Sequence, residues 1–591
     1  MGLFGKRSVS LYSASALLGA AAEVAFHIEA NLDVLREPRW LVLLALGAVA
    51  FVIYLLINLI LAAVFSVIPF LKTLEARAIT IAASALAVPH FVYLVTVYAP
   101  ATPAERGALY VFVVVLTPLA MAALVHVLRH PPVKRAAAVF LACLFIVALS
   151  FFLVPRLSNY GKSDRPNVVL ITLDTVRPDH LAAYGYKTSE QPNISALGAE
   201  GIVVGGVTCE IPASGPSHAT IMTSLSVSDH KVIFNRTPLN GDVPTLSEAL
   251  KSEGYATAAF VGGSPLWAID SGLDRGFERY DDATRPAYAY TRTPLIGRHL
   301  APRLGILKPD DNPLERPADE VTDAAINWLD SRRDGPFFLW VNYFDAHDDY
   351  LPPQTFAPEG FKDHETQMQI NRKWAAEKTP SPELKDQIID LYDGEIAFTD
   401  SELGRLITRL EERGILENTI ICVAGAYGEA FGEHGNKYHG FNVYREDVHV
   451  PLIFYDGGAD LPPTRISNTF PISTLDVAPS LLDLAGIPIS NTMQGRSLFA
   501  EGADRKYGFS AAIPDPTRAH SVPYNGVYAV YSTEAKLIRF VPDETELYNL
   551  TEDPGEVHNL ADETTGLVDE MDTALGKYIK SFPNFDASLE H

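Results

Sequence analysis

The sequence predicts a helical membrane region followed by an α/β domain, in which helices cover a mostly parallel β-sheet, and a small antiparallel subdomain at the C-terminal end. Three observations lead to this fold class. Long apolar runs occupy residues 1–158 of the 591-residue chain. Short apolar runs then alternate with helical patterns over residues 159–498. Residues 499–588 contain short aromatic runs and a final helical pattern.

Five apolar runs form the predicted N-terminal transmembrane bundle. Each is about long enough to cross roughly 30 Å of hydrocarbon; they lie near residues 10–30, 40–70, 77–99, 107–128 and 136–155. Basic residues are more frequent on one side of these spans, and this side is cytoplasmic by the positive-inside rule. The chain after about Pro155 is therefore predicted to lie outside the cytoplasm. No cleavable signal peptide is evident, so we expect the spans to remain as the anchor.

Three polar residues, Glu23, His27 and Glu29, interrupt the first run. Glu23 and His27 share a helix face at i, i+4 spacing, which fits either an amphipathic interfacial helix or a functional site within the membrane. A transporter fits poorly, because the other spans contain little that could form a polar pathway. The last three residues, 589–591, resemble the start of an expression tag and are left out of the fold prediction.

Charge separates the two regions. Residues 1–160 contain 11 Lys/Arg and 6 Asp/Glu, which leaves 36 and 65 for residues 161–591 and a net charge of about −29. So acidic a domain is not expected to bind nucleic acid, and an anionic substrate needs a local cationic pocket. Of the three cysteines, Cys209 and Cys422 lie in the acidic part. Spacing does not establish a disulfide between them, and buried free thiols are the favoured interpretation.

The acidic part alternates between the two kinds of element. Strands are predicted at residues 168–173, 202–207, 257–261, 337–344, 419–423 and 451–455. Helices are predicted at residues 219–225, 245–252, 319–330, 382–412 and 474–485. Strands at 524–531 and 536–540 and a helix at 567–581 form the predicted C-terminal subdomain. Because ligands bind at the carboxyl ends of parallel strands, Asp174, which follows the first strand, is a candidate site residue. Taken alone, it could equally be a helix-capping or turn aspartate.

Residues 167–186, which read NVVLITLDTVRPDHLAAYGY, resemble the first signature of the sulfatase and alkaline phosphatase superfamily. Residues 211–223, IPASGPSHATIMT, resemble its nucleophile segment, and residues 546–561 its C-terminal signature. The resemblance runs from about residue 167 to residue 561. It implies that Asp174 binds a divalent cation and that Ser214 is the nucleophile. At a helix start, a serine also gains the positive field and free N–H groups of the helix N-terminus, although it could be a capping residue only.

Three histidines complete the site that the resemblance implies. His218 stands where classical sulfatases have arginine, His347 ends the motif at residues 337–347, and His439 follows the Gly-Glu-His-Gly segment at residues 432–435. The resemblance implies that they bind the ester oxygens, with Lys437 as a further candidate. Formylglycine is not expected, because Cys209 is misplaced for it and Ser214 would need its own maturation system. The family branch usually has histidine where Asn342 stands.

The third metal-binding segment departs from the family pattern. The superfamily writes Ser-Asp-His-Gly-Glu or Ser-Asp-Asn-Gly-Glu there, whereas residues 425–429 read GAYGE. Ala426 offers no ligand atom, and the neutral phenol of Tyr427 is a poor ligand. Binding of Mg, Mn, Ca or Zn by Asp174 and Ser214 is therefore expected to be severely weakened unless Glu429, Glu433 or Tyr427 bends into the site.

Two functions follow from this sequence. The first is a membrane-anchored pseudoenzyme whose pocket binds a sulfate or phosphate ester or an anionic headgroup without turnover, in a regulatory role. The second is an active metal-dependent ester hydrolase or headgroup transferase that uses Ser214. The layout resembles that of lipoteichoic-acid synthases, which implies a bacterial cytoplasmic membrane, a periplasmic or extracellular domain, and a lipid, glycan or envelope-protein partner.

Overall fold

In the computed structural model of this chain, the described residues are 165–189, 191–282, 315–332, 335–457, 471–500, 505–514, 524–542 and 544–582. All of them belong to one unit, Tyr160–His591. The predicted membrane region, residues 1–158, and the terminal residues 589–591 lie outside this part of the chain. Within the described ranges, no helix has both the length and the apolar character that a membrane crossing needs.

A seven-stranded sheet forms the centre of the unit, with the strand order β2-β10-β7-β1-β6-β4-β5. Strand β1 pairs in parallel with β6 and β7, and β4 pairs in parallel with β5 and β6, whereas β10 runs antiparallel to β2 and β7. The strands are β1 (Asn167–Leu173), β2 (Ile202–Val204), β4 (Ala256–Val261), β5 (Arg279–Asp281), β6 (Phe337–Tyr343), β7 (Thr419–Gly425) and β10 (Leu452–Asp456). The prediction of a mostly parallel sheet is confirmed.

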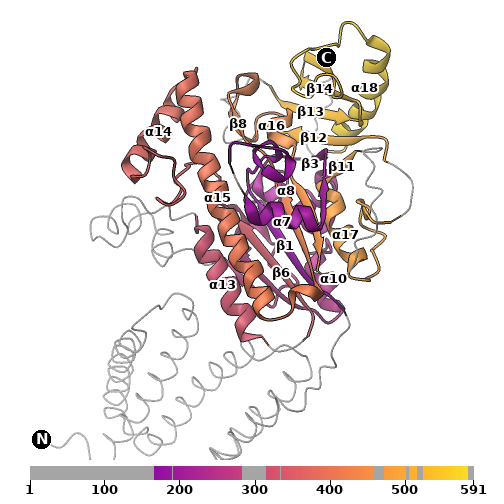
Figure 1. The fold of residues 1–591 in the computed structure, drawn as a ribbon. Coiled ribbons are helices and arrows are strands. Elements are labelled where there is room, and N and C mark those ends of the chain that lie inside the picture. Colours follow the sequence, from indigo (N-terminus) through magenta and orange to yellow (C-terminus); the bar gives the residue numbers. More distant parts are fainter. Residues whose placement is uncertain are drawn as a thin grey trace, which may run out of the picture. The chain divides into compact units, whose positions relative to one another are not determined.

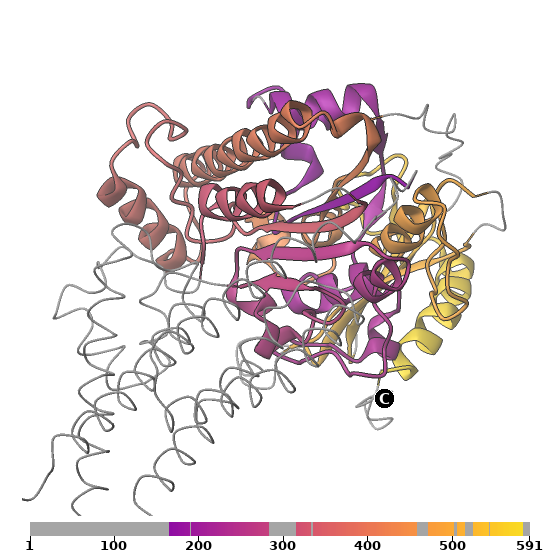
Figure 2. The same cartoon turned by 90° about the horizontal axis from the view of Figure 1, so that it is seen from below.

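The sheet is buried on both faces, which explains why its strands read as continuous apolar runs. Alternate residues of β1 belong to two separate cores, Val168 and Leu170 to one and Val169 and Ile171 to the other. Helices α8 (Ser214–Thr223), α10 (Leu246–Ser252) and α17 (Val477–Leu484) cover the first face. The other face is covered by α7 (Pro192–Glu200), α13 (Ala318–Ser331) and α15 (Pro382–Glu412), and α14 (His364–Ala376) packs against α15. Figures 1 and 2 show the sheet between these two layers.

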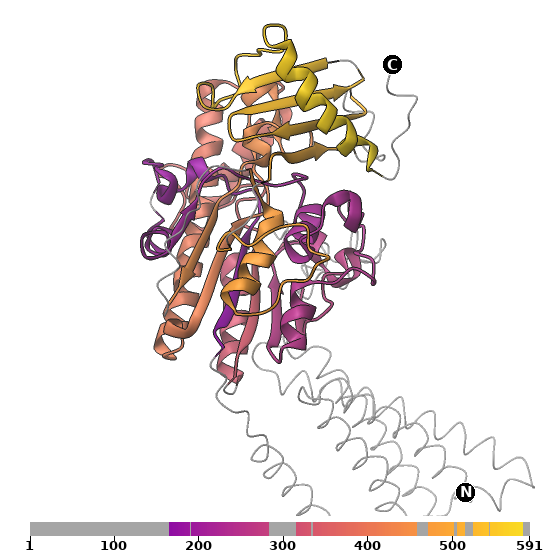
Figure 3. The ribbon, with the colours of Figure 1, turned by 90° about the vertical axis from the view of Figure 1, so that its right-hand side faces the viewer.

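A second, antiparallel sheet follows in the chain, with the order β12-β13-β14-β15. Its strands are β12 (Gly508–Ala512), β13 (Gly526–Tyr531), β14 (Ala535–Val541) and β15 (Glu544–Asn549), and α18 (Thr565–Lys580) lies across one face, as Figure 3 shows. The Tyr578 hydroxyl on α18 donates to Glu210 Oε1 (2.8 Å), and the N–H of Ala511 on β12 donates to the Glu210 carbonyl (2.7 Å). Glu210 therefore joins this subdomain to the central part. The predicted small antiparallel subdomain is confirmed.

Several element boundaries differ from the prediction. The run at residues 202–207 forms two strands in different sheets, β2 and β3 (Val207–Thr208), because Gly206 adopts a positive φ between them. The helix predicted from residue 219 begins five residues earlier, at Ser214, whereas α15 has the predicted bounds. Cys209 and Cys422 are buried free thiols, as favoured from the sequence.

Candidate active site

The carboxyl ends of β1 and β7 bring two of the predicted site segments together. The two strands are in parallel register, with Leu173 beside Gly425. The N–H of Ala426 donates to the Leu173 carbonyl (2.8 Å), so the residue after Ala426 lies next to the residue after Leu173. These two residues are Tyr427 and Asp174. The sequence-based prediction that the altered segment faces Asp174 is therefore met by the fold.

Ser214 reaches the same point from helix α8. It is the first residue of the helix, after the extended N-cap residue Ala213, and its hydroxyl donates to Asp174 Oδ2 (2.8 Å). The hydroxyl of Ser217, one turn further along, donates to the carbonyl of Ala426. These two bonds fix the helix start against the ends of both strands. Ser214 is only 1% exposed.

Tyr427 closes a triangle of oxygen atoms with Ser214 and Asp174. Its hydroxyl lies 2.9 Å from Asp174 Oδ2 and 2.8 Å from Ser214 Oγ. Burial, followed by the charge of Asp174, raises the pKa of Tyr427 well above its usual value, so the phenol stays protonated. Two hydroxyl protons serve three short contacts, so only two of the contacts can be hydrogen bonds at one time. Both hydroxyls are placed to donate to the carboxylate; in the two alternative arrangements one hydroxyl donates to the other, which in turn donates to Asp174.

The other oxygen of Asp174 is bonded from β6. Asn342 Nδ2 donates to Asp174 Oδ1 (2.9 Å), and Asn342 Oδ1 accepts the N–H of Gly262 (3.3 Å), which sets the orientation of the amide. Sequence comparison with the family marked Asn342 as unusual but gave it no role. The structure shows that this side chain is a direct partner of the predicted metal ligand.

His218 lies behind the serine and is fully buried. Its Nδ1 lies 2.7 Å from the Ser214 carbonyl, which can only accept, so Nδ1 carries a proton. Burial lowers the pKa of His218, which makes the ring neutral and leaves Nε2 as an acceptor for the Thr172 hydroxyl at 3.0 Å. Both ring nitrogens therefore have protein partners, and the predicted role of His218 in binding substrate oxygens would require it to give one up.

The N-terminus of α8 is also less open than the sequence analysis assumed. The N–H of Gly215 donates to Asn235 Oδ1 (2.8 Å), and the N–H of Ser217 donates to the Ala213 carbonyl (3.0 Å). Pro216 has no N–H. The N–H groups of Gly215 and Ser217, which were expected to be free, are therefore already hydrogen-bonded. An anionic ester at Ser214 would depend more on side chains for its hydrogen bonds.

His347 and His439 lie on the more exposed side of Tyr427, with side chains 19% and 15% exposed. The ring centroids of Tyr427 and His439 are 4.7 Å apart, and those of His439 and His347 are 5.1 Å apart. Burial opposes protonation of His347, but the hydrogen bond and charge of Asp348, followed by the charges of Glu315 and Glu429, raise its pKa to about 10. His347 is therefore a cation at neutral pH. The side chains of His347 and His439 are more exposed than Ser214, which is 1% exposed.

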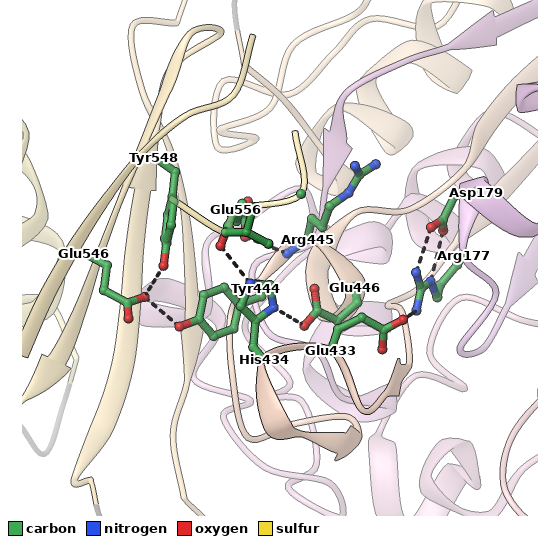
Figure 4. A pocket seen from close by; sticks show the side chains of 12 residues that line it. Arg177, Asp179, Glu433, His434, Tyr444, Arg445, Glu446, Glu546, Tyr548 and Glu556 are labelled. Atoms are coloured by element: carbon green, nitrogen blue, oxygen red, sulfur yellow. Dashed lines mark hydrogen bonds and ion pairs between the residues drawn. The ribbon is translucent and has the colours of Figure 1, made fainter. Parts of the chain in front are cut away.

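Two other residues from the same loop are used elsewhere. Lys437 Nζ donates to the carbonyls of Trp374 and Glu377 at the end of α14, so it is not part of the histidine group. His434 bonds Glu446 (2.8 Å) and stacks on Tyr444. It lines a polar cavity of about 620 Å³ between the central part and the C-terminal sheet. Figure 4 shows this cavity with its arginine, glutamate and tyrosine lining.

The residues around Asp174 do not fit a divalent cation. Such ions need several oxygen or nitrogen ligands without hydrogens directed at the metal. Asp174 is the one carboxylate in the group, and three protein donors already face it. Glu429 is directed to His439 (3.3 Å) and Glu433 to Arg177 (3.3 Å), so neither completes a ligand set. Across the described ranges, no three His, Cys, Asp or Glu side chains are grouped so that they could hold a metal ion.

The acidic partners of His347 were missed from the sequence. Asp348 is the next residue in the chain, and its Oδ1 lies 3.0 Å from His347 Nδ1. The sequence did offer a signal for this contact, because an acidic residue follows the predicted site histidine directly. Glu315 has no such signal, because only the fold brings it close.

The site thus combines a helix-borne serine with an aspartate at the end of a central parallel strand of an α/β sheet. The Sulfatase family model matches residues 166–487, which is more than half of the chain. The chain belongs to the sulfatase family. A second model, N-sulphoglucosamine sulphohydrolase, C-terminal, matches residues 432–581, which include the antiparallel sheet and α18.

Individual relatives agree with this assignment. The N-acetylglucosamine-6-O-sulfatase of Bacteroides thetaiotaomicron is 26% identical over 491 residues, covering 68% of this chain and 83% of the relative. The arylsulfatase of Clostridium perfringens is 25% identical over 442 residues, covering 67% of this chain and 90% of the relative.

Solved structures show the same fold. A protein in complex with its substrate D-glucosamine-2-N,6-O-disulfate has a TM-score of 0.57 at 22% identity and covers 72% of this chain and 100% of its own. The phosphonate monoester hydrolase of Agrobacterium radiobacter has a TM-score of 0.55 at 20% identity, with coverage of 71% and 95%.

Proposed function

We propose that this protein hydrolyses sulfate monoesters, with Ser214 as the nucleophile. The observation that carries the proposal is the hydrogen bond from Ser214 Oγ to Asp174 Oδ2, 2.8 Å long, within a segment matched by the Sulfatase family. A buried carboxylate next to a hydroxyl can accept its proton as the oxygen attacks. Family membership favours this function over the pseudoenzyme that the altered segment suggested.

The chain's own residues can balance the reaction. Ser214 Oγ forms a bond to sulfur, the bond from sulfur to the alcohol oxygen breaks, and the serine proton passes to Asp174. The leaving oxygen takes a proton from the cationic His347. Water then attacks the sulfoserine and gives a proton to His347, and Ser214 Oγ leaves the sulfur and recovers its proton from Asp174. Hydrogensulfate is released.

Turnover is expected to be slow for two reasons. A metal ion that polarises the ester is worth several kcal/mol of barrier, and the residues here do not fit one. Ser214 is also covered by the Tyr427 phenol, which has to move away before an ester can reach the hydroxyl. His347 supplies the positive charge that receives the anion, and the ring of His439 lies beside it.

Sulfated sugars are the substrate class that we propose. The relative from Bacteroides thetaiotaomicron is named for a sugar sulfate, and a structural neighbour holds a glucosamine disulfate as its substrate. A phosphonate monoester hydrolase shares the fold, so phosphate and phosphonate esters belong in the same assay.

The apolar runs at residues 10–155 support a membrane anchor with the catalytic domain outside the cytoplasm. Carbonate extraction of membranes, with protease added to intact cells, tests this location.

The decisive experiment measures release of 4-nitrophenol from its sulfate and phosphate esters, and of sulfate from glucosamine 6-sulfate, by the purified full-length protein. Ser214→Ala should abolish any turnover. Ser510→Ala is the matched control, because Ser510 is equally buried and donates one hydrogen bond to the Cys209 carbonyl, far from Asp174 in the sequence. Equal turnover by wild type and Ser214→Ala would reject the proposal.

Binding without turnover is the second candidate, and the closed Tyr427–Ser214 contact favours it. It predicts that inorganic sulfate binds with a heat change that His347→Gln removes, while none of the esters is hydrolysed. This outcome would replace the hydrolase proposal with a sensor or regulatory domain.

A further inference from the structure

The carboxylate of Asp174 is fully buried, and such a group is stable only when a counter-charge or hydrogen bonds compensate its desolvation. In this protein three neutral donors surround it: the hydroxyls of Ser214 and Tyr427 on Oδ2 and the amide of Asn342 on Oδ1. The amide orientation is fixed independently, because Asn342 Oδ1 accepts the N–H of Gly262. His218 Nε2 lies further away, 3.5 Å from Asp174 Oδ1.

We infer that Asn342 and Tyr427 together take the place of a divalent cation beside Asp174, so that the site is closed to metal ions. A cation at either carboxylate oxygen would face the hydrogens of an amide or of a hydroxyl. It would also have to displace an amide that is held by Gly262, the residue after β4, and a phenol that contacts Ser214 on α8. The two residues act as positioning residues for Ser214, because they hold its hydrogen-bond acceptor in one orientation. The compensation of the buried Asp174 charge does not depend on whether Ser214 turns over an ester.

The placement of the two positions supports this inference. Both differ from the residues that the family resemblance implies, one at the end of β6 and the other after β7, and both are directed at the same carboxylate from different strands. Loss of a ligand at position 426 or 427 alone would leave a buried charge without a partner. An amide on one oxygen and a phenol on the other provide what the cation would have provided.

The test uses the full-length protein and metal ions alone. Wild-type protein is incubated with Mn, Mg, Ca or Zn, desalted and subjected to elemental analysis, and its melting temperature is measured with and without a chelator. The expected result is less than about one tenth of a cation per chain and a melting temperature that the chelator does not change. One cation per chain that disappears in Asp174→Asn would overturn the inference.

A second variant tests whether the Asn342 amide compensates the negative charge of Asp174. Asn342→Asp places a second carboxylate beside Asp174, and we expect a large fall in melting temperature that Ca or Mn reverses by roughly 5 °C or more. Asn371→Asp is the matched control, because Asn371 is also a buried amide but bonds the backbone of Tyr350. A cation should not reverse the fall in melting temperature of Asn371→Asp. Equal responses of the two variants would count against the inference, and if Asn342→Asp does not fold, the metal content of the wild type decides.

Discussion

The phenol oxygen of Tyr427 lies 2.9 Å from Asp174 Oδ2, where the ends of two neighbouring parallel strands meet. This contact joins a residue that departs from the family pattern to the residue that the family would use as a metal ligand. The Tyr427 hydroxyl therefore contributes to the hydrogen bonding of Asp174 and also covers Ser214.

Removal of this hydroxyl should destabilise the protein. Tyr427→Phe keeps the ring but deletes a donor to a buried carboxylate, and we expect a loss of about 1–3 kcal/mol in the free energy of unfolding, measured by urea denaturation. Tyr255→Phe is the control, since Tyr255 is 2% exposed and its hydroxyl has no hydrogen-bond partner among the described residues. If both variants lose the same stability, the Tyr427–Asp174 bond contributes nothing.

Anion binding should depend on the charge of His347. Although burial opposes it, the pKa of His347 is raised to about 10, chiefly by Asp348. The positive charge is therefore present at neutral pH and is lost as the pH rises through 10. Inorganic sulfate should bind with constant affinity between pH 7 and 9 and more weakly above pH 10, as measured by calorimetry.

The matching variant is His347→Gln, which should weaken sulfate binding at pH 7 by about 10- to 100-fold, as expected for the loss of one charged hydrogen bond. Its affinity should not change between pH 9 and 10.5. A wild-type affinity that already falls near pH 6.5 would contradict the raised pKa of His347.

Stability should also depend on Glu210, which joins the two sheets. Burial raises the pKa of Glu210 to about 7, whereas its value in the unfolded chain is near 4.5. A group with a raised pKa in the folded state stabilises the protein fully below pH 4.5, and this contribution is lost as the pH rises to 7. The stability of wild type minus that of Glu210→Gln should therefore fall by up to about 3 kcal/mol over this interval and then stay constant.

Urea unfolding at several pH values checks this difference. The exposed Glu563→Gln is the control, and its difference from wild type should not change with pH in the same way. A pH-independent difference for Glu210→Gln would mean that Glu210 titrates normally in the folded protein.

A buried ion pair lies within the C-terminal part of the domain. Lys536 Nζ lies 2.8 Å from Glu556 Oε1, with side chains 4% and 2% exposed. Lys536→Met leaves a buried carboxylate without its cation and should cost about 3–5 kcal/mol of unfolding free energy. The double variant with Glu556→Gln should recover part of this loss, because the uncompensated charge is gone. If the double variant recovers no stability, Lys536 and Glu556 are not energetically coupled.

Much of the scaffold could be predicted from local sequence patterns. Strands buried on both faces appear as continuous apolar runs, so β1, β6 and β7 were found close to their observed ends, and their parallel pairing placed Asp174, Ser214 and the segment with Ala426 and Tyr427 at one edge. Strand β3 was merged with β2 because it has only two residues, and β12 and β15 were missed because their sequences, GFSAA and ETELYN, contain no continuous run of large apolar residues.

The sequence by itself determined which side chains are available at this edge: a serine, an aspartate and two histidines, with alanine and tyrosine where ligands were expected. Only the tertiary structure decided how they are used. Hydrogen bonds require partners within about 3 Å, and these partners come from strands and helices far apart in the chain. For this reason the amide of Asn342 on Asp174, the acceptor state of His218, the occupied N–H groups of α8 and the position of Lys437 against α14 appear only in the folded protein.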